Sequence, residues 1–399
     1  MLNVVTAQEA LRIILENAPA MTKTETVSLE DALHRTAAED ILSPEDLPAF
    51  ARSTVDGYAV IAEDTFGCSE SIPAMLLCDG EILMGERPEQ KLEKGHCIRI
   101  STGGSLPPGS DAVSMIEYTD DMGDEFRYIY KPVSCLENVN NTGDDVSAGS
   151  AVLKKGAAIS SRSIAVLAAL GIAQVKVTGK IRVGILSTGD ELVEYAAKPE
   201  GAQIRNINSV MLKAQVEEQG ADPVVYPIVK DELPLLTDAL KAALKECDMV
   251  LISGGSSVGE KDNTFRVLHD LGQVLFHGIS IKPGKPTLFA DVDGKPVFGL
   301  PGHPQAAFFI FRLFAAPCLR KMMRSEDSGL WIERILSSNI PSNHGREEII
   351  PVRLDGQYVH PLYANSGAIS GLTRADGYIR IAREAEGLQK DTRVEVFLL

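Results

Sequence analysis

The sequence is poor in cysteine and in basic residues, and each shortage excludes a class of protein. It has 6 cysteines in 399 residues, and none of them forms a CxxC pair. Neither a zinc site nor a disulfide framework is therefore indicated, and buried, reduced thiols are expected. Acidic residues outnumber basic ones, 55 to 39, for a net charge of −16. This balance argues against nucleic-acid binding but leaves room for a small anionic ligand at a locally basic site.

Long hydrophobic runs are also missing. The most apolar segment, residues 306–316, is interrupted by Arg312 and ends at Pro317, so it is too short to span a bilayer. Residues 1–9 lack a basic stretch followed by an apolar one, which is the pattern of a signal peptide. We therefore expect no membrane partner and a cytoplasmic location.

What remains is the composition of an ordinary globular protein, with 44% hydrophobic and 24% charged residues, and a length that suggests two to four domains. Residues 4–17 predict a helix with Thr6 as N-cap and Glu9 completing a capping box. A second short helix is predicted at residues 29–35. Residues 51–137 alternate short β-like runs with Gly/Pro turns, which predicts a small β-rich domain.

From residue 181 to about 324 the pattern becomes strand, loop, helix. Such alternation predicts a mainly parallel sheet covered by helices on both faces. The predicted strands are 181–186, 224–228, 249–252 and 297–300, and the predicted helices are 209–219, 233–246, 263–271 and 305–323. Residues 161–177 predict a helix followed by an extended segment. The tail, 330–399, predicts a small β-barrel or sandwich.

Three glycine-bearing loops follow apolar strands of the α/β segment. They are Ser187-Thr188-Gly189-Asp190-Glu191, the segment from Ser253-Gly254-Gly255-Ser256-Ser257 to Glu260, and Pro301-Gly302-His303-Pro304. Ligands of open α/β sheets bind outside the carboxyl ends of the strands, where glycines let backbone N–H groups approach an oxyanion. For any single loop a plain βα turn explains the glycines equally well. GxxxxGK[ST] is absent, and no GxGxxG follows Leu186, so a Walker-type ATPase and a dinucleotide dehydrogenase are not favoured.

Charged residues accompany these loops. Lys282 and Lys285 flank a Pro-Gly pair and can point at a common anion, although solvated surface lysines fit the segment too. Carboxylates can hold Mg²⁺ together with substrate phosphates and waters. Those that occur beside the loops are Asp190, Glu191, Asp231, Glu260 and Asp262. Each can also be explained without a metal, and Asp262 in particular can be only an N-cap.

Two further motifs lie in the β-rich segment. Ser53-Thr-Val-Asp56-Gly-Tyr-Ala-Val60 and Ile100-Ser-Thr102-Gly-Gly are turn-rich, and hairpin turns account for them.

Taken together, the motifs resemble those of the molybdopterin molybdenumtransferases, the MoeA family that includes the gephyrin E domain. The similarity runs through nearly the whole chain. Its motifs are Ser53–Val60, Ile100–Gly104, Gly109-Ser-Asp-Ala-Val113, Ser187–Leu192, Ser253–Asp262, Lys282-Pro-Gly-Lys285-Pro and Leu300–Pro304.

The resemblance implies a multidomain α/β plus β protein with four domains. An elongated domain takes residues 1–50 with 138–178, an inserted β-rich domain 51–137, a central MogA-like α/β domain 179–326, and a small β-barrel domain 327–399. It also implies a homodimer in which Asp56 and Thr102 complete a site of the second subunit. Molybdopterin adenylyltransferase and molybdoenzyme apoproteins are further partners that it suggests.

The implied reaction inserts molybdate into adenylylated molybdopterin with Mg²⁺ as cofactor and releases AMP. The catalytic residues by resemblance are Asp56, Thr102, Glu191, Asp231 and Asp262, of which Asp56, Glu191 and Asp262 would hold the metal. The substrate-binding residues by resemblance are Ser187, Thr188, Gly189, Asp190, Ser253, Gly254, Gly255, Ser257, Lys282, Lys285, Pro301, Gly302, Pro304, Asp145, Arg346 and Ser366.

The chain departs from the family pattern at three places. His303 stands where the family usually has Asn, Val55 where it has Met, and Asn206-Ile-Asn208-Ser209 where it has Asp-Ser-Asn-Ser. Two alternatives therefore stay open, a tungstate-inserting paralogue and a non-catalytic scaffold. An adenylyltransferase is disfavoured, because that family is about as long as the α/β segment alone.

Overall fold

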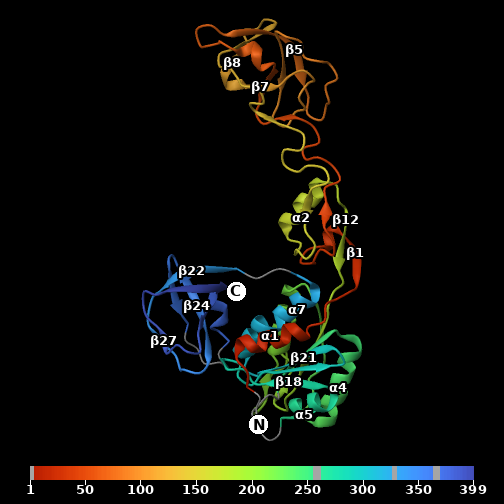
Figure 1. Ribbon diagram of the computed structural model, residues 1–399, viewed down its shortest axis with the longest axis vertical. Helices are drawn as coiled ribbons and strands as arrows, with labels where there is room; N and C mark the ends of the chain where they lie inside the picture. The colour runs from red at the N-terminus through yellow and green to blue at the C-terminus, as the bar shows by residue number, and fades with distance from the viewer. Residues whose placement is uncertain (1–3, 255–261, 326–329, 363–368) are drawn as a thin grey trace. The chain divides into compact units, whose positions relative to one another are not determined.

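The computed structural model describes residues 4–254, 262–325, 330–362 and 369–399, and the chain divides into two compact units (Figure 1). One unit comprises Met1–Glu39, Lys155–Ser161 and Gln174–Leu399; the other, here called the β unit, comprises Asp40–Lys154 and Arg162–Ala173. None of the described helices has the length and apolar character that a membrane span requires. All six cysteines are free, and Cys135 is exposed rather than buried. The four-domain division stays a prediction.

The β unit is a six-stranded sheet with strand order β7-β4-β6-β5-β9-β8. The strands are β4 (Gly57–Val60), β5 (Ala74–Ile82), β6 (His96–Ile100), β7 (Ala112–Met115), β8 (Thr119–Asp120) and β9 (Phe126–Ile129). Strands β7 and β8 follow each other through a 3₁₀ turn, η3 (Ile116–Tyr118), so the two edges of the sheet belong to one stretch of chain. Tyr58, Leu76 and Ile129 belong to its core.

Six short elements lie outside this sheet. They are β2 (Ile41–Leu42), β3 (Arg52–Ser53), η2 (Ala62–Thr65), β10 (Val139–Asn140), β11 (Ala151–Leu153) and α2 (Ser161–Ala169). Strand β2 pairs with β11 and β3 with β10, so the segments that enter and leave the sheet run side by side.

The larger unit contains a second six-stranded sheet, in the order β16-β13-β17-β21-β20-β18. Its strands are β13 (Arg182–Ser187), β16 (Asp222–Val225), β17 (Met249–Ser253), β18 (Gln273–His277), β20 (Leu288–Val292) and β21 (Lys295–Leu300). The first four in this order are parallel, whereas β20 and β18 are antiparallel to their neighbours. The sequence did not predict β18 or β20, so the sheet is larger and more mixed than expected.

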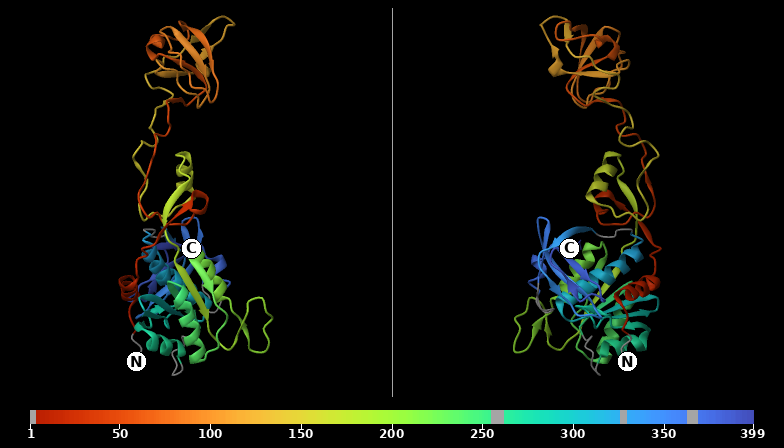
Figure 2. Two further views of the ribbon diagram at one scale, coloured as in Figure 1. Left: turned by 90° about the vertical axis from the view of Figure 1, so that its right-hand side faces the viewer. Right: turned by 60° about the vertical axis from the view of Figure 1, so that its left-hand side comes forward.

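Helices cover both faces of this sheet, as the sequence predicted (Figure 2). They are α1 (Ala7–Asn17), α3 (Asn208–Glu218), α4 (Leu233–Glu246), α5 (Asn263–Leu271), α6 (Pro304–Ile310) and α7 (Ala316–Met323). In β17, Met249 and Leu251 pack in the core with α1, α3 and α6, while Val250 and Ile252 pack in the core with α4 and α5. A strand buried on both faces has an unbroken apolar sequence, which explains why this one was easy to predict.

A π-helical turn, η4 (Phe311–Ala315), joins α6 to α7, so the helix predicted at 305–323 is continuous but not regular. The predicted N-cap of α1 is present, since the Thr6 hydroxyl accepts from Glu9 N at 3.1 Å. The helix predicted at 29–35 was wrong. Only a 3₁₀ turn, η1 (Leu29–Asp31), forms, and backbone bonds between residues 34–37 and 157–159 replace the rest.

The C-terminal part of the larger unit is a β-barrel, as predicted. It consists of β22 (Trp331–Leu336), β24 (Glu347–Asp355), β25 (Tyr358–Pro361), β26 (Gly377–Ile381) and β28 (Arg393–Leu398), and it closes where β24 pairs with β26. Strand β19 (Ile281–Lys282) joins its edge, with Lys282 opposite Glu348. The remaining short elements are β1 (Thr24–Ser28), β12 (Gln174–Thr178), β14 (Leu192–Val193), β15 (Ile204–Arg205), β23 (Ile340–Pro341), η5 (Leu372–Arg374) and β27 (Gly387–Leu388).

Candidate functional site

The predicted loops meet at the carboxyl edge of the parallel strands. Ser187, the last residue of β13, is paired with Ser253 at the end of β17, which in turn is paired with Leu300 at the end of β21. Asn208, the first residue of α3, links two of the loops, because its Nδ2 donates to Ser253 Oγ at 2.8 Å and to the Gly302 carbonyl at 2.9 Å. Three separate motifs therefore form one edge.

A cavity of about 760 Å³ opens at this edge. Predicted residues line it, namely Thr188, Glu191, Ser253, Gly254, Gly302 and Pro304, together with residues 203–208. The Thr188 hydroxyl and Asn208 Oδ1 are buried and have no hydrogen-bond partner among the described residues. Buried polar atoms are normally satisfied, so these two atoms indicate a polar ligand or water in the cavity. Asn208 was not predicted as a site residue.

A second cavity, of about 840 Å³, is lined by Lys282, Lys285, Pro301 and Arg346, all of which were predicted. His303 lines both cavities. Lys282 and Arg346 carry cationic groups that suit an oxyanion. One acidic side chain lies among them: Glu348 Oε1 is 2.6 Å from Lys282 Nζ, and its Oε2 accepts from the Ser342 hydroxyl at 2.7 Å. Glu348 is buried, whereas Lys282 is half exposed.

Three of the predicted carboxylates, Asp190, Asp231 and Asp262, lie near one another but are not among the described residues that line the first cavity. Asp190 Oδ1 accepts from Asp231 N at 3.3 Å, and Asn263 Nδ2 donates to Asp231 Oδ1 at 3.2 Å. Asp262 is buried and caps α5, its Oδ1 accepting from Phe265 N at 2.9 Å. Its Oδ2 lies 3.3 Å from His277 Nε2, and neither atom has another partner among the described residues. Burial raises the pKa of the Asp262 carboxyl, and the nearby charge of Asp231 raises it further.

The missing acid of the family pattern is replaced by Asn206, which still works as an acceptor. Asn206 is buried, and its Oδ1 accepts from the Ser187 hydroxyl at 3.1 Å and from Ser209 N at 3.3 Å. These donors hold the end of β13 against the start of α3. An amide oxygen is sufficient for these two bonds.

Other predicted residues lie elsewhere. Asp56, Thr102 and Asp145 belong to the β unit. Gly255, Ser257 and Ser366 lie outside the described residues. Asp56 and Thr102 do form a pair, because Thr102 donates its backbone N–H at 2.7 Å and its hydroxyl at 3.0 Å to Asp56 Oδ1. These two bonds hold the pKa of the Asp56 carboxyl below its ordinary value.

Thr102→Val is expected to raise the pKa of Asp56 only part of the way to its ordinary value. The substitution removes the hydroxyl donor but keeps the backbone donor, which is the stronger cause of the lowered pKa. The bond from Thr102 N to the Asp56 carboxylate weakens as pH falls through the pKa of Asp56. The variant therefore loses this bond at a higher pH than the wild type. Carbon NMR titration of Asp56 measures this, with Thr119→Val as a control. An unchanged pKa would assign the whole effect to the backbone bond.

The backbone of Gly254 packs closely against the backbone of the loop that follows β13. Its φ is +102°, and a Cβ there would lie 2.1 Å from the Thr188 carbonyl oxygen. We expect Gly254→Ala to lower the free energy of unfolding by about 2 kcal/mol or more beyond the cost of left-handed backbone alone. Gly294→Ala is the matched control, because Gly294 has φ +77° with nothing within 4 Å. Equal losses for the two variants in urea unfolding would contradict the steric argument.

The α/β part of the larger unit defines the class of protein. Residues 184–321 match the family model for a probable molybdopterin binding domain. Residues 5–171 match the model for the MoeA N-terminal region (domain I and II), and residues 333–399 match that for the MoeA C-terminal region (domain IV). The chain belongs to the MoeA family.

Known relatives are similar to this chain over nearly its full length. A putative molybdopterin biosynthesis protein of Methanocaldococcus jannaschii is 40% identical over 94% of this chain and 92% of its own. The molybdopterin molybdenumtransferase of Bacillus subtilis is 33% identical over 94% of this chain and 90% of its own. A crystal structure of the molybdopterin biosynthesis MoeA protein from Pyrococcus horikoshii OT3 superposes with a TM-score of 0.87 at 34% identity, covering 99% of this chain and all of that one.

Proposed function

We propose that this chain is a molybdopterin molybdenumtransferase that inserts molybdenum from molybdate into adenylylated molybdopterin and releases AMP. As a member of its family it is a transferase of molybdenum cofactor biosynthesis. The proposed reaction is supported by two cavities that share His303 as a lining residue. One is lined by glycine loops and buried polar atoms, and the other by Lys282, Lys285 and Arg346.

The two cavities suit the two substrates. Lysine and arginine side chains provide several N–H donors to a small oxyanion, so we assign molybdate to the second cavity, beside Pro301. Adenylylated molybdopterin is assigned to the first cavity, where backbone N–H groups and the start of α3 favour phosphate. His303 then lies where the two substrates meet, and it takes the place of the usual Asn.

Mg²⁺ is the proposed cofactor. The donor set fits, since the predicted ligands Asp56, Glu191 and Asp262 offer the hard oxygen atoms that Mg²⁺ prefers. A further carboxylate is near, because the charge of Asp231 reaches Asp262. No three acidic, histidine or cysteine side chains form a metal cluster among the described residues. The site would therefore use one or two carboxylates with substrate phosphates and waters. When bound, the ion would neutralise charge on the phosphoanhydride that is cleaved.

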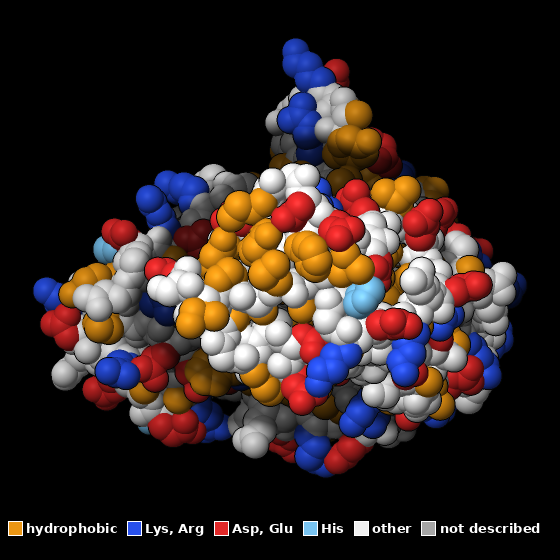
Figure 3. Space-filling view, turned by 90° about the horizontal axis from the view of Figure 1, so that it is seen from above, with side chains coloured by type: hydrophobic (Ala, Val, Ile, Leu, Met, Phe, Trp, Pro, Cys, Tyr) orange, Lys and Arg blue, Asp and Glu red, His pale blue; other side chains and the backbone are white. Residues whose placement is uncertain are grey.

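We also propose a homodimer in which Asp56 and Thr102 of one subunit complete the site of the other. Both side chains are exposed on the β unit. The β unit also exposes large hydrophobic side chains such as Phe66, Ile72 and Met75, and hydrophobic side chains gather on the face seen in Figure 3. Such surfaces are typical of protein contacts. Molybdopterin adenylyltransferase and molybdoenzyme apoproteins are the other proposed partners.

The reaction is tested by supplying adenylylated molybdopterin, molybdate and Mg²⁺, then measuring AMP and the cofactor formed. We expect AMP and cofactor in equal amounts, and loss of both with a chelator. AMP release without cofactor would contradict the proposal. For the dimer, a mixture of inactive Asp56→Ala and Asp262→Ala chains is expected to regain part of the activity, because mixed dimers contain one intact site. No recovery on mixing would contradict a shared site.

The tungstate alternative rests on His303. An imidazole beside the oxyanion, in place of the usual Asn, would change the preference between molybdate and tungstate. Comparing molybdate with tungstate in the wild type and in His303→Asn tests it. Faster turnover with tungstate in the wild type, reversed in the variant, would favour the alternative. A chain that binds both substrates without turnover would favour the non-catalytic scaffold.

A further inference from the structure

Three side chains at the start of helix α5 form a closed set of contacts. Asp262 caps the helix, because Phe265 N donates to its Oδ1 at 2.9 Å. The ring of Phe265 stacks on the imidazole of His277, with centroids 4.9 Å apart and planes 18° from parallel. His277 Nε2 lies 3.3 Å from Asp262 Oδ2, which completes the set. We call these three residues the α5 triangle.

The order of elements along the chain brings the α5 triangle together. Helix α5 ends at Leu271 and strand β18 begins at Gln273, so only Gly272 separates them. The nine residues of α5 span about 14 Å, and the five residues of β18 span about 16 Å. Two packed elements of similar length, joined by one residue, place the end of the second beside the start of the first. His277, the last residue of β18, therefore lies beside the cap of α5.

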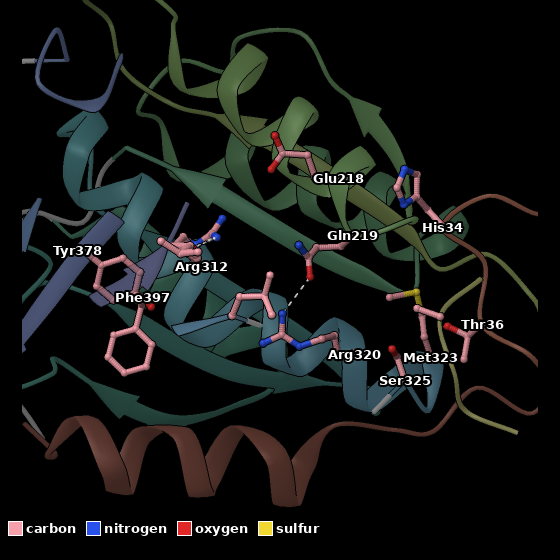
Figure 4. Close-up of a pocket in the computed structure, with 13 residues that line it drawn as sticks. His34, Thr36, Glu218, Gln219, Arg312, Arg320, Met323, Ser325, Tyr378 and Phe397 are labelled. Carbon is pink, nitrogen blue, oxygen red and sulfur yellow. Dashed lines mark hydrogen bonds between the residues drawn. The ribbon is translucent and has the colours of Figure 1, made fainter. Parts of the chain in front are cut away.

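The α5 triangle lies apart from the two cavities that share His303, because none of its residues lines either of them. A third cavity, of about 210 Å³, lies beside Arg312 and Tyr378 in Figure 4, and the triangle does not line that cavity either. A role of His277 in the proposed reaction therefore runs through Asp262.

The contacts fix the orientation of the Asp262 carboxylate. Its two oxygens have different partners, since Oδ1 is held by the backbone of α5 and Oδ2 lies against the imidazole at the end of β18. Rotation of the carboxylate about its Cβ–Cγ bond would break both contacts. Each carboxylate oxygen has two lone pairs, so each keeps one for a cation. The side chains of Asp262 and His277 are 7% and 15% exposed, so little water competes for their contact.

We propose that His277 is a positioning residue of the transfer reaction, which orients the Asp262 carboxylate toward the metal ion and the substrate phosphates. This role rests on the proposed function of Asp262 as a magnesium ligand. Partners that hold a metal ligand in place typically change metal affinity about 10- to 100-fold when they are mutated. The separation of 3.3 Å is long for a hydrogen bond, and such contacts commonly shorten once the substrate is bound. Phe265 supports the imidazole by stacking on it.

Two substitutions separate the nitrogen of His277 from its ring. His277→Phe keeps a ring that can stack on Phe265 but has no N–H, whereas His277→Gln keeps an N–H donor and loses the ring. Binding of Mn²⁺, which takes the same carboxylate and water ligands as Mg²⁺, is measured by electron paramagnetic resonance on the full chain with AMP present. We expect His277→Phe to weaken Mn²⁺ binding about tenfold and His277→Gln to recover most of that loss.

His269→Phe is the matched control and is expected to bind Mn²⁺ as the wild type does. The exposed His269 ring also packs against Phe265, with centroids 5.9 Å apart, but its nitrogen is paired with Asp270 rather than with Asp262. Phe265→Leu keeps the backbone cap and removes the stacked ring, so a smaller change in the same direction as His277→Phe is expected. It replaces His277→Phe if that variant does not fold.

The same variants are assayed for cofactor formation at varied Mg²⁺. We expect His277→Phe to raise the Mg²⁺ concentration for half-maximal rate about tenfold, with a smaller change in kcat at saturating Mg²⁺. Urea unfolding is measured in parallel. A purely structural role of His277 would lower the free energy of unfolding without changing the binding of Mn²⁺.

The outcomes distinguish this role from the proposed reaction. Wild-type Mn²⁺ binding in His277→Phe, with binding lost in Asp262→Asn, would overturn the role of His277 and leave the reaction intact. Equal losses in His277→Phe and His277→Gln, with lowered stability in urea, would assign the effect to packing and overturn it too. If Asp262→Asn binds Mn²⁺ as the wild type does, or the wild type binds none, Asp262 is not a metal ligand and the role of His277 is overturned with it. The reaction itself is judged separately, by AMP and cofactor formation.

Discussion

Replacement of Asp262 by asparagine is expected to lower the rate of molybdenum insertion about 100-fold or more while the fold is retained. On the proposed role, the carboxylate supplies charge to the metal and phosphates. The structure shows that the same group caps α5 through the bond from Phe265 N. An amide keeps an oxygen for that cap but removes the charge, so this substitution separates the two roles.

Asp262→Ala provides the comparison. It removes the cap and leaves His277 without its neighbour, so we expect it to cost about 1 kcal/mol of stability as well as activity. Asp270→Asn, an exposed acid at the other end of α5, is the matched control. Cofactor formation and urea unfolding are measured on all three variants. Wild-type turnover in Asp262→Asn would leave Asp262 with a capping role alone.

Lys282→Met is expected to lower kcat/KM for molybdate about 100-fold, and Glu348→Gln to change it in the opposite direction. Lys282 is held at 2.6 Å by the buried Glu348, which competes with an anionic substrate for its charge. Removing the lysine leaves a buried carboxylate facing the oxyanion. Removing the acid frees the ammonium group and keeps the bond from Ser342, because the amide oxygen still accepts.

The double variant, Lys282→Met with Glu348→Gln, is expected to recover part of the loss, since no unpaired carboxylate remains. Steady-state rates at varied molybdate measure all three variants. Lys176→Met breaks an exposed pair with Glu39 at 2.9 Å and serves as the control. If Glu348→Gln weakened molybdate use as much as Lys282→Met does, the pair would act as one binding element and the competition argument would be wrong.

Local patterns predicted those elements whose residues carry the signal themselves. The helices α4 and α5 have the predicted bounds, because apolar spacing, Pro234 and the cap at Asp262 mark them. Strands β18 and β20 were missed because a segment rich in proline and glycine separates them, and they are joined only through the sheet. Residues 29–35 have a helical pattern, but pairing with distant residues 157–159 overrides it.

In the site, too, the sequence predicted local features but not the contacts between distant residues. The motifs predicted which loops would meet, because parallel strands bring their carboxyl ends to one edge. Sequence could not predict that Glu348 lies against Lys282, since the two are 66 positions apart and are joined by the register of β19 with β24. The link from Asn208 to Gly302 spans 94 positions and has no local signal. His277 beside Asp262 was missed for the same reason.

The insertion of the β unit into the larger unit also sets an order of events during synthesis. The β unit is nearly complete once residue 154 has left the ribosome, so it can fold early. Strand β1, made long before, must wait for β12, with Thr24 pairing with Thr178. Helix α1 waits longer still, because its core partners include residues 309–323. Helix α1 is therefore made before most of its core partners, and its apolar face is left unburied until they have been synthesised.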